Sequence, residues 1–149
     1  MTQGRHKQDG LSDGVHRTRV RVRFGDTDPY GIVYFVSYFR YCHGGIEEYL
    51  RACGLKPEET FKNLREDYGL PIVEAWCRFR RPVRYGELLR LETRVREIRS
   101  RAMIFGFEFY PETGQELLAE GSAHLVAIDA AWRARELPES IKSALSQQK

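Results

Sequence analysis

The stretch FGDTDPYGIVYFVSYFRYCHGGIEEYLRACG, residues 24–54, decides the fold of this chain. It opens with a turn-rich acidic loop, Gly25 to Gly31, in which two aspartates, one proline and two glycines occupy seven positions. Loops of this composition hold a fixed shape. In the residues that follow, apolar side chains recur every three or four positions, which is the period of an α-helix: Phe35, Tyr38, Cys42, Ile46, Tyr49, Leu50 and Cys53. The pattern predicts a long helix from about Val36 to Cys53.

Two features define this predicted helix further. Ser37 near its start is a possible cap, and Gly54 is a suitable stop. In the interior, Gly44 and Gly45 each cost about 1 kcal/mol of helix stability relative to alanine. We interpret that cost as a sign of close approach to a sheet strand, with a bound ligand as the alternative.

A helix that begins just after an aspartate has the groups needed for chemistry on a carbonyl. The first amides of a helix lack internal partners, and the helix dipole places partial positive charge at the same end. If Asp28 faces the amides near Tyr34 and Phe35, one site offers a carboxylate and hydrogen-bond donors for an oxyanion. The alternative is that Asp28 only forms an Asx-turn or a cap within its Asp-Pro-x-Gly turn.

Length and composition limit the possibilities. A chain of 149 residues suits one domain, and we expect a polar flexible tail over residues 1–14 and a single domain over residues 15–149. The 24 basic residues are nearly balanced by 21 acidic ones, which argues against nucleic-acid binding. Neither a membrane span of ~20 apolar residues nor the apolar centre of a signal peptide is found, so we expect a cytoplasmic protein.

The three cysteines predict no special chemistry. Cys42, Cys53 and Cys77 are odd in number and lie within predicted helix and strand. We expect them to be reduced and buried, acting as small packing residues. No Cys–His cluster has metal-ligand spacing, and we predict no metal site.

Alternating apolar and polar residues predict five strands. Residues 15–24 alternate, with Val20, Val22 and Phe24 on one face and arginines on the other. After Pro71, four more segments with strand character follow one another through short turns: Ile72–Arg80, Leu88–Ile98, Met103–Tyr110 and Glu116–Ile128. Successive strands with short reversals indicate an antiparallel sheet, so the predicted class is α+β. Lys56 to Gly69 is predicted as a connection over part of the site, with a short helix at Pro57–Arg65.

The run Phe24 to Tyr34, with Tyr38 and the long helix after it, resembles the signature of the 4-hydroxybenzoyl-CoA thioesterase family of hotdog-fold acyl-CoA thioesterases. A looser resemblance extends from about Arg17 to Leu145 and includes the turn at Arg81–Glu87. It implies a hotdog fold, in which a long helix lies on the concave face of the antiparallel sheet. It also implies hydrolysis of an acyl-CoA, with Asp28 as nucleophile or general base and the Phe35 amide polarising the carbonyl. No cofactor is expected, because the coenzyme A thiolate leaves readily.

The resemblance also implies further site residues. Gly31, Tyr34, Tyr38 and His43 are the expected substrate-binding residues, and Arg99, Arg101 and Arg133 are expected to bind the phosphates of coenzyme A. Histidine at position 43 departs from the resembled enzyme, where an acidic residue recognises the phenolic hydroxyl, and this puts hydroxybenzoate itself in doubt. A lone helical histidine is also commonly just a satisfied polar residue, and charged turns commonly serve only to protect a sheet edge.

Other aspects of function stay open at this point. The family implies a homodimer or homotetramer with sites at the subunit interface. An acyl carrier protein in place of coenzyme A and a non-catalytic acyl-CoA binder are the alternatives. Hotdog dehydratases and hydratases need a histidine in the site, and the loop has none.

Overall fold

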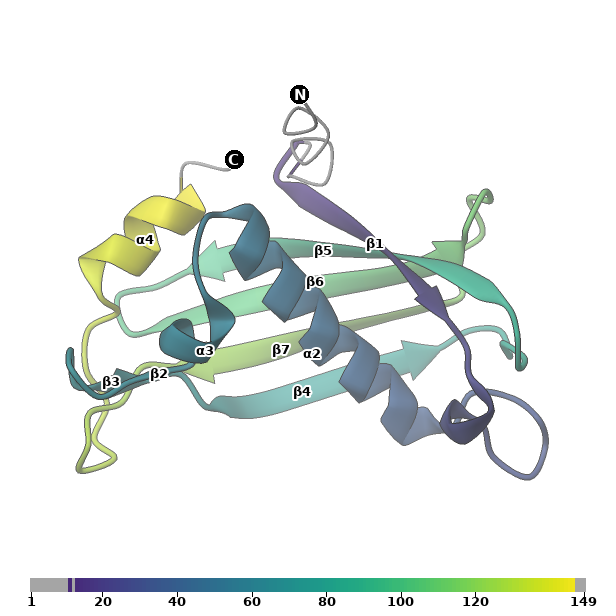
Figure 1. The fold of residues 1–149 in the computed structure, drawn as a ribbon, viewed down its shortest axis with the longest axis horizontal. Coiled ribbons are helices and arrows are strands. Elements are labelled where there is room, and N and C mark those ends of the chain that lie inside the picture. Colours follow the sequence, from purple (N-terminus) through teal and green to yellow (C-terminus); the bar gives the residue numbers. More distant parts are fainter. Residues whose placement is uncertain (1–10, 12, 147–149) are drawn as a thin grey trace.

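The computed structural model describes residue 11 and residues 13–146, and its centre is a long helix lying against a five-stranded sheet (Figure 1). The helix, α2, spans Phe35–Ala52. The strand order is β1-β5-β6-β7-β4, and every neighbouring pair is antiparallel. The strands are β1 (Val15–Arg21), β4 (Ile72–Phe79), β5 (Leu88–Ile98), β6 (Ala102–Pro111) and β7 (Ala119–Val126). This arrangement confirms the predicted α+β class and the hotdog architecture.

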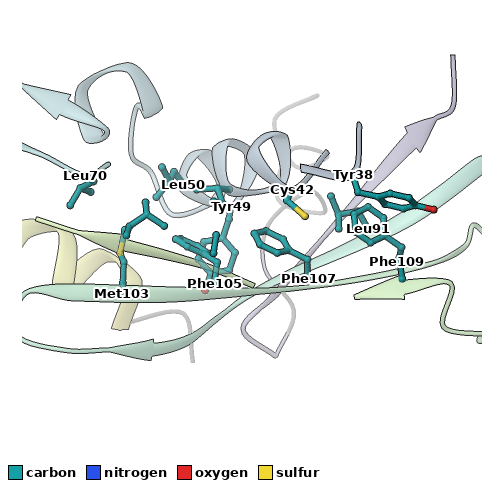
Figure 2. Close-up of a cluster of buried hydrophobic side chains, with 14 of the residues drawn as sticks. Tyr38, Cys42, Tyr49, Leu50, Leu70, Leu91, Met103, Phe105, Phe107 and Phe109 are labelled. Atoms are coloured by element: carbon teal, nitrogen blue, oxygen red, sulfur yellow. The ribbon is translucent and has the colours of Figure 1, made fainter. Parts of the chain in front are cut away.

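The core lies between α2 and the inner face of the sheet (Figure 2). Successive side chains of a strand point to opposite faces, so alternate residues of β6 all point toward the helix. These are Met103, Phe105, Phe107 and Phe109, each at most 1% exposed. They meet the apolar side of α2, whose buried residues include Tyr38, Cys42, Ile46, Tyr49 and Leu50.

The start of α2 differs from the prediction in its cap. The residue before the helix is Tyr34, and no side chain caps it. Ser37 is therefore not the cap: its Oγ donates a hydrogen bond to the carbonyl oxygen of Asp26 at 2.9 Å. At the other end the predicted stop is confirmed. Gly54 has a φ of +85°, and the Leu55 amide donates to the Leu50 carbonyl at 2.9 Å, as in a Schellman motif.

Only one of the two helical glycines packs as predicted. A Cβ atom on Gly45 would lie 2.5 Å from Oγ1 of Thr93 on β5, so Gly45 lets the helix approach the sheet. A Cβ atom on Gly44 would meet no heavy atom within 4 Å. The prediction of close approach is confirmed for Gly45 and wrong for Gly44.

Two other predictions are corrected, and one further helix is found. The helix predicted over Pro57–Arg65 is only α3 (Pro57–Thr60), because the chain then turns into a small hairpin of β2 (Lys62–Asn63) and β3 (Tyr68–Gly69). Phe24 does not join the inner face: β1 ends at Arg21, and Phe24 lies 79% exposed in a short 3-10 turn, η2 (Phe24–Asp26). A final helix that was not predicted, α4 (Glu139–Ser146), covers the core with Ile141 and Leu145.

The predicted tail over residues 1–14 lies mostly outside the described residues. Across the part of the chain that the structure describes, no helix combines the length and apolar character that a membrane span requires.

Candidate active site

The acidic loop folds as a tight reversal in front of α2. The Asp28 amide donates to the carbonyl of Ile32 at 2.9 Å, and the Gly31 amide donates back to the carbonyl of Asp28 at 2.9 Å. Thr27 and Val33 form an antiparallel bridge that closes the loop. Gly31 has a φ of +80°, a conformation that glycine adopts without strain. The loop composition therefore produces a fixed turn that carries Asp28.

Asp28 is the residue on which the sequence-based hypothesis depends. Its Oδ1 atom accepts a hydrogen bond from the Tyr30 amide at 2.8 Å, so the Asx-turn alternative describes its local geometry correctly. The other oxygen, Oδ2, receives no hydrogen bond from the residues that the structure describes. The Asx-turn fixes the carboxylate through one oxygen and leaves the second available for a ligand.

Asp28 lines a cavity of about 330 Å³ beside the start of α2. The cavity brings together three of the predicted site residues, Asp28, Phe35 and Tyr38. Its other lining residues come from the end of the loop, from the last residue of β4 and from the segment after this strand: Ile32, Val33, Phe79, Arg80, Arg81, Pro82 and Val83. Gly31 and Tyr34 are not among its lining residues, although the residues that follow them in the sequence, Ile32 and Phe35, do line it.

The start of α2 offers unoccupied hydrogen-bond donors next to this carboxylate. The Tyr34 amide donates to the Asp26 carbonyl at 2.8 Å, and the Ser37 amide donates to the Tyr34 carbonyl at 2.8 Å. Between them, the amides of Phe35 and Val36 have no acceptor among the described residues. Free amides at a helix N-terminus, with the helix dipole behind them, stabilise negative charge. The site thus combines a carboxylate with donors suited to an oxyanion.

Tyr38 forms an apolar wall of the cavity. It is 3% exposed, and its ring packs against Phe79 and Phe109 with centroid distances of 5.0 and 5.3 Å. Burial raises the pKa of Tyr38 to about 12, so its hydroxyl stays protonated at neutral pH. Together with the half-exposed rings of Phe35 and Phe79, it gives the cavity an aromatic lining.

Sequence reasoning assigned no role to Asp26, which makes most of the contacts between loop and helix. Its carboxylate accepts hydrogen bonds from the Arg23 amide and the Tyr41 hydroxyl, both at 2.9 Å, and from Arg40 at 3.4 Å. Burial opposes ionisation of this carboxyl, but these hydrogen bonds outweigh it and lower the pKa of Asp26. The signal available in the sequence was the first aspartate of the loop, two residues before Asp28.

Two arginines in the cavity wall were also missed. Arg80 forms an ion pair with Glu120, and Nε of Arg81 lies 2.8 Å from a carboxylate oxygen of Glu116. In the sequence this segment was recognised only as a turn around Pro82. The two guanidinium groups place positive charge, partly neutralised by their partners, at the rim of the cavity that holds Asp28.

A second cavity, of about 520 Å³, lies at the opposite end of β4. Phe79 at one end of this strand lines the first cavity, and Ile72 at the other end lines the second. Strands rise by ~3.3 Å per residue, so the two cavities are on the order of 20 Å apart in one chain. His43 lines the second cavity with its ring stacked on Phe61 at 5.0 Å. The structure therefore separates His43 from Asp28.

The three arginines predicted to bind coenzyme A gather at the same end as His43. Arg99 and Arg101 lie in the β5–β6 turn, which is joined to the C-terminal segment by a hydrogen bond from the Leu137 amide to the Ser100 carbonyl. Arg133 follows Trp132, which lines the second cavity. Figure 1 shows this end of the sheet, near β2 and β3, facing away from the loop before α2. Arg99 is paired with Glu97, and Arg101 is paired with Glu136.

Comparison with protein families identifies the superfamily to which this fold belongs. Residues 22–145 match the model of the thioesterase-like superfamily. The chain belongs to this superfamily. Among curated proteins, this thioesterase is 37% identical over 126 residues to a 1,4-dihydroxy-2-naphthoyl-CoA hydrolase of Prochlorococcus marinus strain MIT 9303, covering 80% of this chain and 82% of the relative. The predicted enzyme class, thioester hydrolase, is confirmed by these findings.

Two solved structures, which are 25% and 26% identical in sequence to this chain, show the same fold. A 1,4-dihydroxy-2-naphthoyl-CoA thioesterase from Synechocystis has a TM-score of 0.80 and 25% identity, with 89% of this chain and 96% of that chain covered. A gentisyl-coenzyme A thioesterase has a TM-score of 0.74 and 26% identity, with 85% of this chain and 98% of that chain covered.

Proposed function

We propose that this thioesterase hydrolyses aryl-CoA esters whose aromatic ring carries a hydroxyl next to the acyl group, with 1,4-dihydroxy-2-naphthoyl-CoA as the preferred candidate. The observation that carries the proposal is that Asp28 and Phe35, whose amide has no acceptor among the described residues, line the same aromatic cavity. The names of the relatives supply the acyl group. Gentisyl and 1,4-dihydroxy-2-naphthoyl groups share a ring with one hydroxyl beside the carbonyl carbon and a second hydroxyl para to the first.

The cavity suits such an acyl group because its walls are flat and apolar. Tyr38, Phe35 and Phe79 contribute aromatic surface, and aromatic rings pack well against one another in offset or edge-to-face arrangements. The sequence resemblance pointed to hydroxybenzoyl-CoA, but the acidic residue that would bind its hydroxyl is replaced by His43. A naphthoyl group has a second ring, and it gains more from aromatic burial than a benzoyl group does.

In the proposed mechanism the thioester carbonyl accepts a hydrogen bond from the Phe35 amide, which stabilises the oxyanion of the tetrahedral intermediate. Asp28 acts in one of two ways. As a nucleophile, its carboxylate oxygen attacks the carbonyl carbon, the C–S bond breaks, coenzyme A leaves as a thiolate, and water hydrolyses the resulting anhydride. As a general base, Asp28 takes a proton from a water molecule that attacks the same carbon. Both routes end in the free acid and coenzyme A.

The active form in this proposal is a dimer formed through β4. This strand is the last in the sheet order, and several of its apolar side chains are 40–57% exposed: Ile72, Val73, Trp76 and Phe79. An exposed apolar edge strand is a site for pairing with another chain. Antiparallel pairing of β4 with its copy would bring the Phe79 end of one subunit next to the Ile72 end of the other.

Dimerisation would thereby complete the site. The cavity with Asp28 would meet the cavity that contains His43 of the partner subunit, and the partner's Arg99, Arg101 and Arg133 would lie at the same end. This accounts for the separation of the predicted residues within one chain. The planar guanidinium group of arginine matches the geometry of a phosphate, so these three residues are proposed to hold the phosphates of coenzyme A. Two such dimers would make the homotetramer expected from the family.

The test is thiol release from 1,4-dihydroxy-2-naphthoyl-CoA, 4-hydroxybenzoyl-CoA, benzoyl-CoA and hexadecanoyl-CoA, with an acylated carrier protein as a further substrate. We expect the naphthoyl ester to have the highest kcat/KM, and Asp28→Asn to lower kcat by at least ~100-fold, the scale of losing a positioned acid or base. Asp13→Asn, in an exposed turn, is the matched control and should retain full activity.

Three results would overturn parts of this proposal. Equal activity of wild type and Asp28→Asn would remove Asp28 from the mechanism. If only the carrier-protein thioester is hydrolysed, the acyl carrier of the substrate is the carrier protein and not coenzyme A. Tight binding of the naphthoyl ester without turnover by the wild type would identify a non-catalytic acyl-CoA binder.

A further inference from the structure

Asp26 contacts the residue that precedes α2 and three residues on one face of its first turns. Its carbonyl oxygen accepts hydrogen bonds from the Tyr34 amide and from Oγ of Ser37. Its carboxylate accepts the Tyr41 hydroxyl at 2.9 Å and lies 3.4 Å from a guanidinium nitrogen of Arg40. Ser37 lies three residues after Tyr34, and Arg40 and Tyr41 lie three and four residues after Ser37, so the partners form a continuous row over the first two turns. One residue thus ties the loop to the start of the helix.

The row connects the two halves of the proposed catalytic site. On the loop side, Thr27 alone separates Asp26 from Asp28, and it is held by its bridge to Val33. On the helix side, the anchored Tyr34 immediately precedes the Phe35 amide. The carboxylate of Asp26 also accepts the Arg23 amide at 2.9 Å, and its side chain is only 17% exposed. Asp26 is therefore enclosed on the loop side and on the helix side.

Tyr41 is the partner whose contribution can be isolated. Its ring is held independently of its hydroxyl by two neighbouring rings. It packs edge-to-face on Tyr38 and lies against Phe109, with ring centroids 6.1 and 6.3 Å apart. Removing the hydroxyl alone would leave this packing in place. Among the described residues, the hydroxyl donates its hydrogen bond to the Asp26 carboxylate, so Tyr41→Phe removes that hydrogen bond alone.

We propose that Asp26 and Tyr41 are positioning residues that fix the distance between the Asp28 carboxylate and the Phe35 amide. This inference rests on the proposed function. Neither residue lines the cavity, so neither touches the substrate. Their effect is on geometry: a displacement of about 1 Å in a catalytic group lowers the rate by up to about 100-fold, because reaction requires near-attack alignment.

The experiment compares Tyr41→Phe with Tyr110→Phe. Tyr110 is a matched control, because its hydroxyl also donates to a carboxylate, that of Glu108, at 3.0 Å, on a strand residue that lines neither cavity. Each variant is assayed for kcat and KM with the best thioester and for thermal unfolding. We expect Tyr41→Phe to lower kcat by about 10-fold with KM changed less than about 2-fold, and Tyr110→Phe to leave both unchanged.

A double-mutant cycle tests whether the two residues act as one unit. Asp26→Asn should lower kcat further than Tyr41→Phe, and adding Tyr41→Phe to Asp26→Asn should cause almost no further loss. A purely structural role predicts a different result, with a lower Tm and an unchanged kcat for the folded enzyme. That result, or additive losses in the double variant, would overturn the proposal.

Failure of this inference can be separated from failure of the proposed function. If the wild type is active, Asp28→Asn is inactive and Tyr41→Phe has wild-type kcat, only the positioning role is wrong. If Asp28→Asn is fully active, the catalytic geometry itself is wrong, and with it any role in fixing that geometry.

Discussion

Gly45 of α2 lies so close to Thr93 of β5 that a Cβ atom on the glycine would be 2.5 Å from the threonine Oγ1. It would also lie 3.0 Å from a methyl group of Leu91, so the contact involves two residues of β5. Thr93 is fully buried, which leaves its side chain little room to move. This contact sets how closely α2 can approach the sheet.

We therefore expect opposite effects from alanine at the two neighbouring glycines. Gly45→Ala should lower the free energy of unfolding by about 1–3 kcal/mol through overpacking. Gly44→Ala should raise it by about 0.5–1 kcal/mol, because alanine favours the helix and the position is open. Urea unfolding measures both. Thr93→Ala combined with Gly45→Ala should recover part of the loss, and equal stability of the two single variants would contradict the packing account.

The proposed coenzyme A site predicts a dependence on the phosphates of the substrate. Replacing Arg99, Arg101 or Arg133 with alanine should raise KM for the coenzyme A ester several-fold, because each loses a charge-assisted contact. The same variants should hydrolyse the corresponding N-acetylcysteamine thioester, which has no phosphate, like the wild type. Arg51→Ala, at the end of α2 and paired with Glu48, is the control and should affect neither substrate. An equal rise in KM for both thioesters would argue against phosphate binding.

The dimer proposed through β4 can be tested by changing its exposed tryptophan. Trp76→Lys introduces a charge on the edge strand and should shift the sedimentation equilibrium toward the 17.4 kDa monomer, with a parallel loss of kcat/KM. Trp76→Phe keeps the apolar character and should remain associated. A wild type that sediments as a monomer and is fully active would exclude the composite site.

Asp26 should make the stability of the enzyme sensitive to acid. Its pKa is lowered in the folded state, mainly by the Arg23 amide, Tyr41 and Arg40 acting against the effect of burial, so its contribution is present above the unfolded value of about 3.9. The contribution is lost as the pH falls through the lower, folded pKa. Asp26→Asn should thus be less stable than wild type by about 1–3 kcal/mol at pH 7, and the difference should shrink near pH 2.

Chemical denaturation at the two pH values measures this difference. Asp13→Asn should follow the wild type at both. A deficit of Asp26→Asn that stays the same at pH 7 and pH 2 would show that the carboxylate charge is not responsible.

Local patterns in the sequence predicted most of the fold. The three-to-four spacing from Phe35 to Cys53 gave α2 to within one residue at each end, and alternation gave all five strands of the main sheet. Errors occurred where a tertiary contact decided the local structure. Ser37 was expected to cap the helix, yet its hydroxyl reaches a loop carbonyl that only the folded chain brings near. Phe24 follows the strand pattern, but the chain has already turned at that residue.

The sequence by itself determined the acidic turn, the helix that follows it and the candidacy of Asp28, because turn residues and helical periodicity act over a few neighbouring positions. Only the tertiary structure decided which residues share a site. It joined Asp28 to Phe35 and Tyr38 in one cavity, and it placed His43, further along α2, in the other cavity. It also gave Asp26 its role, since contacts between a loop and the successive turns of a helix depend on how the two pack, and packing is a property of the whole chain.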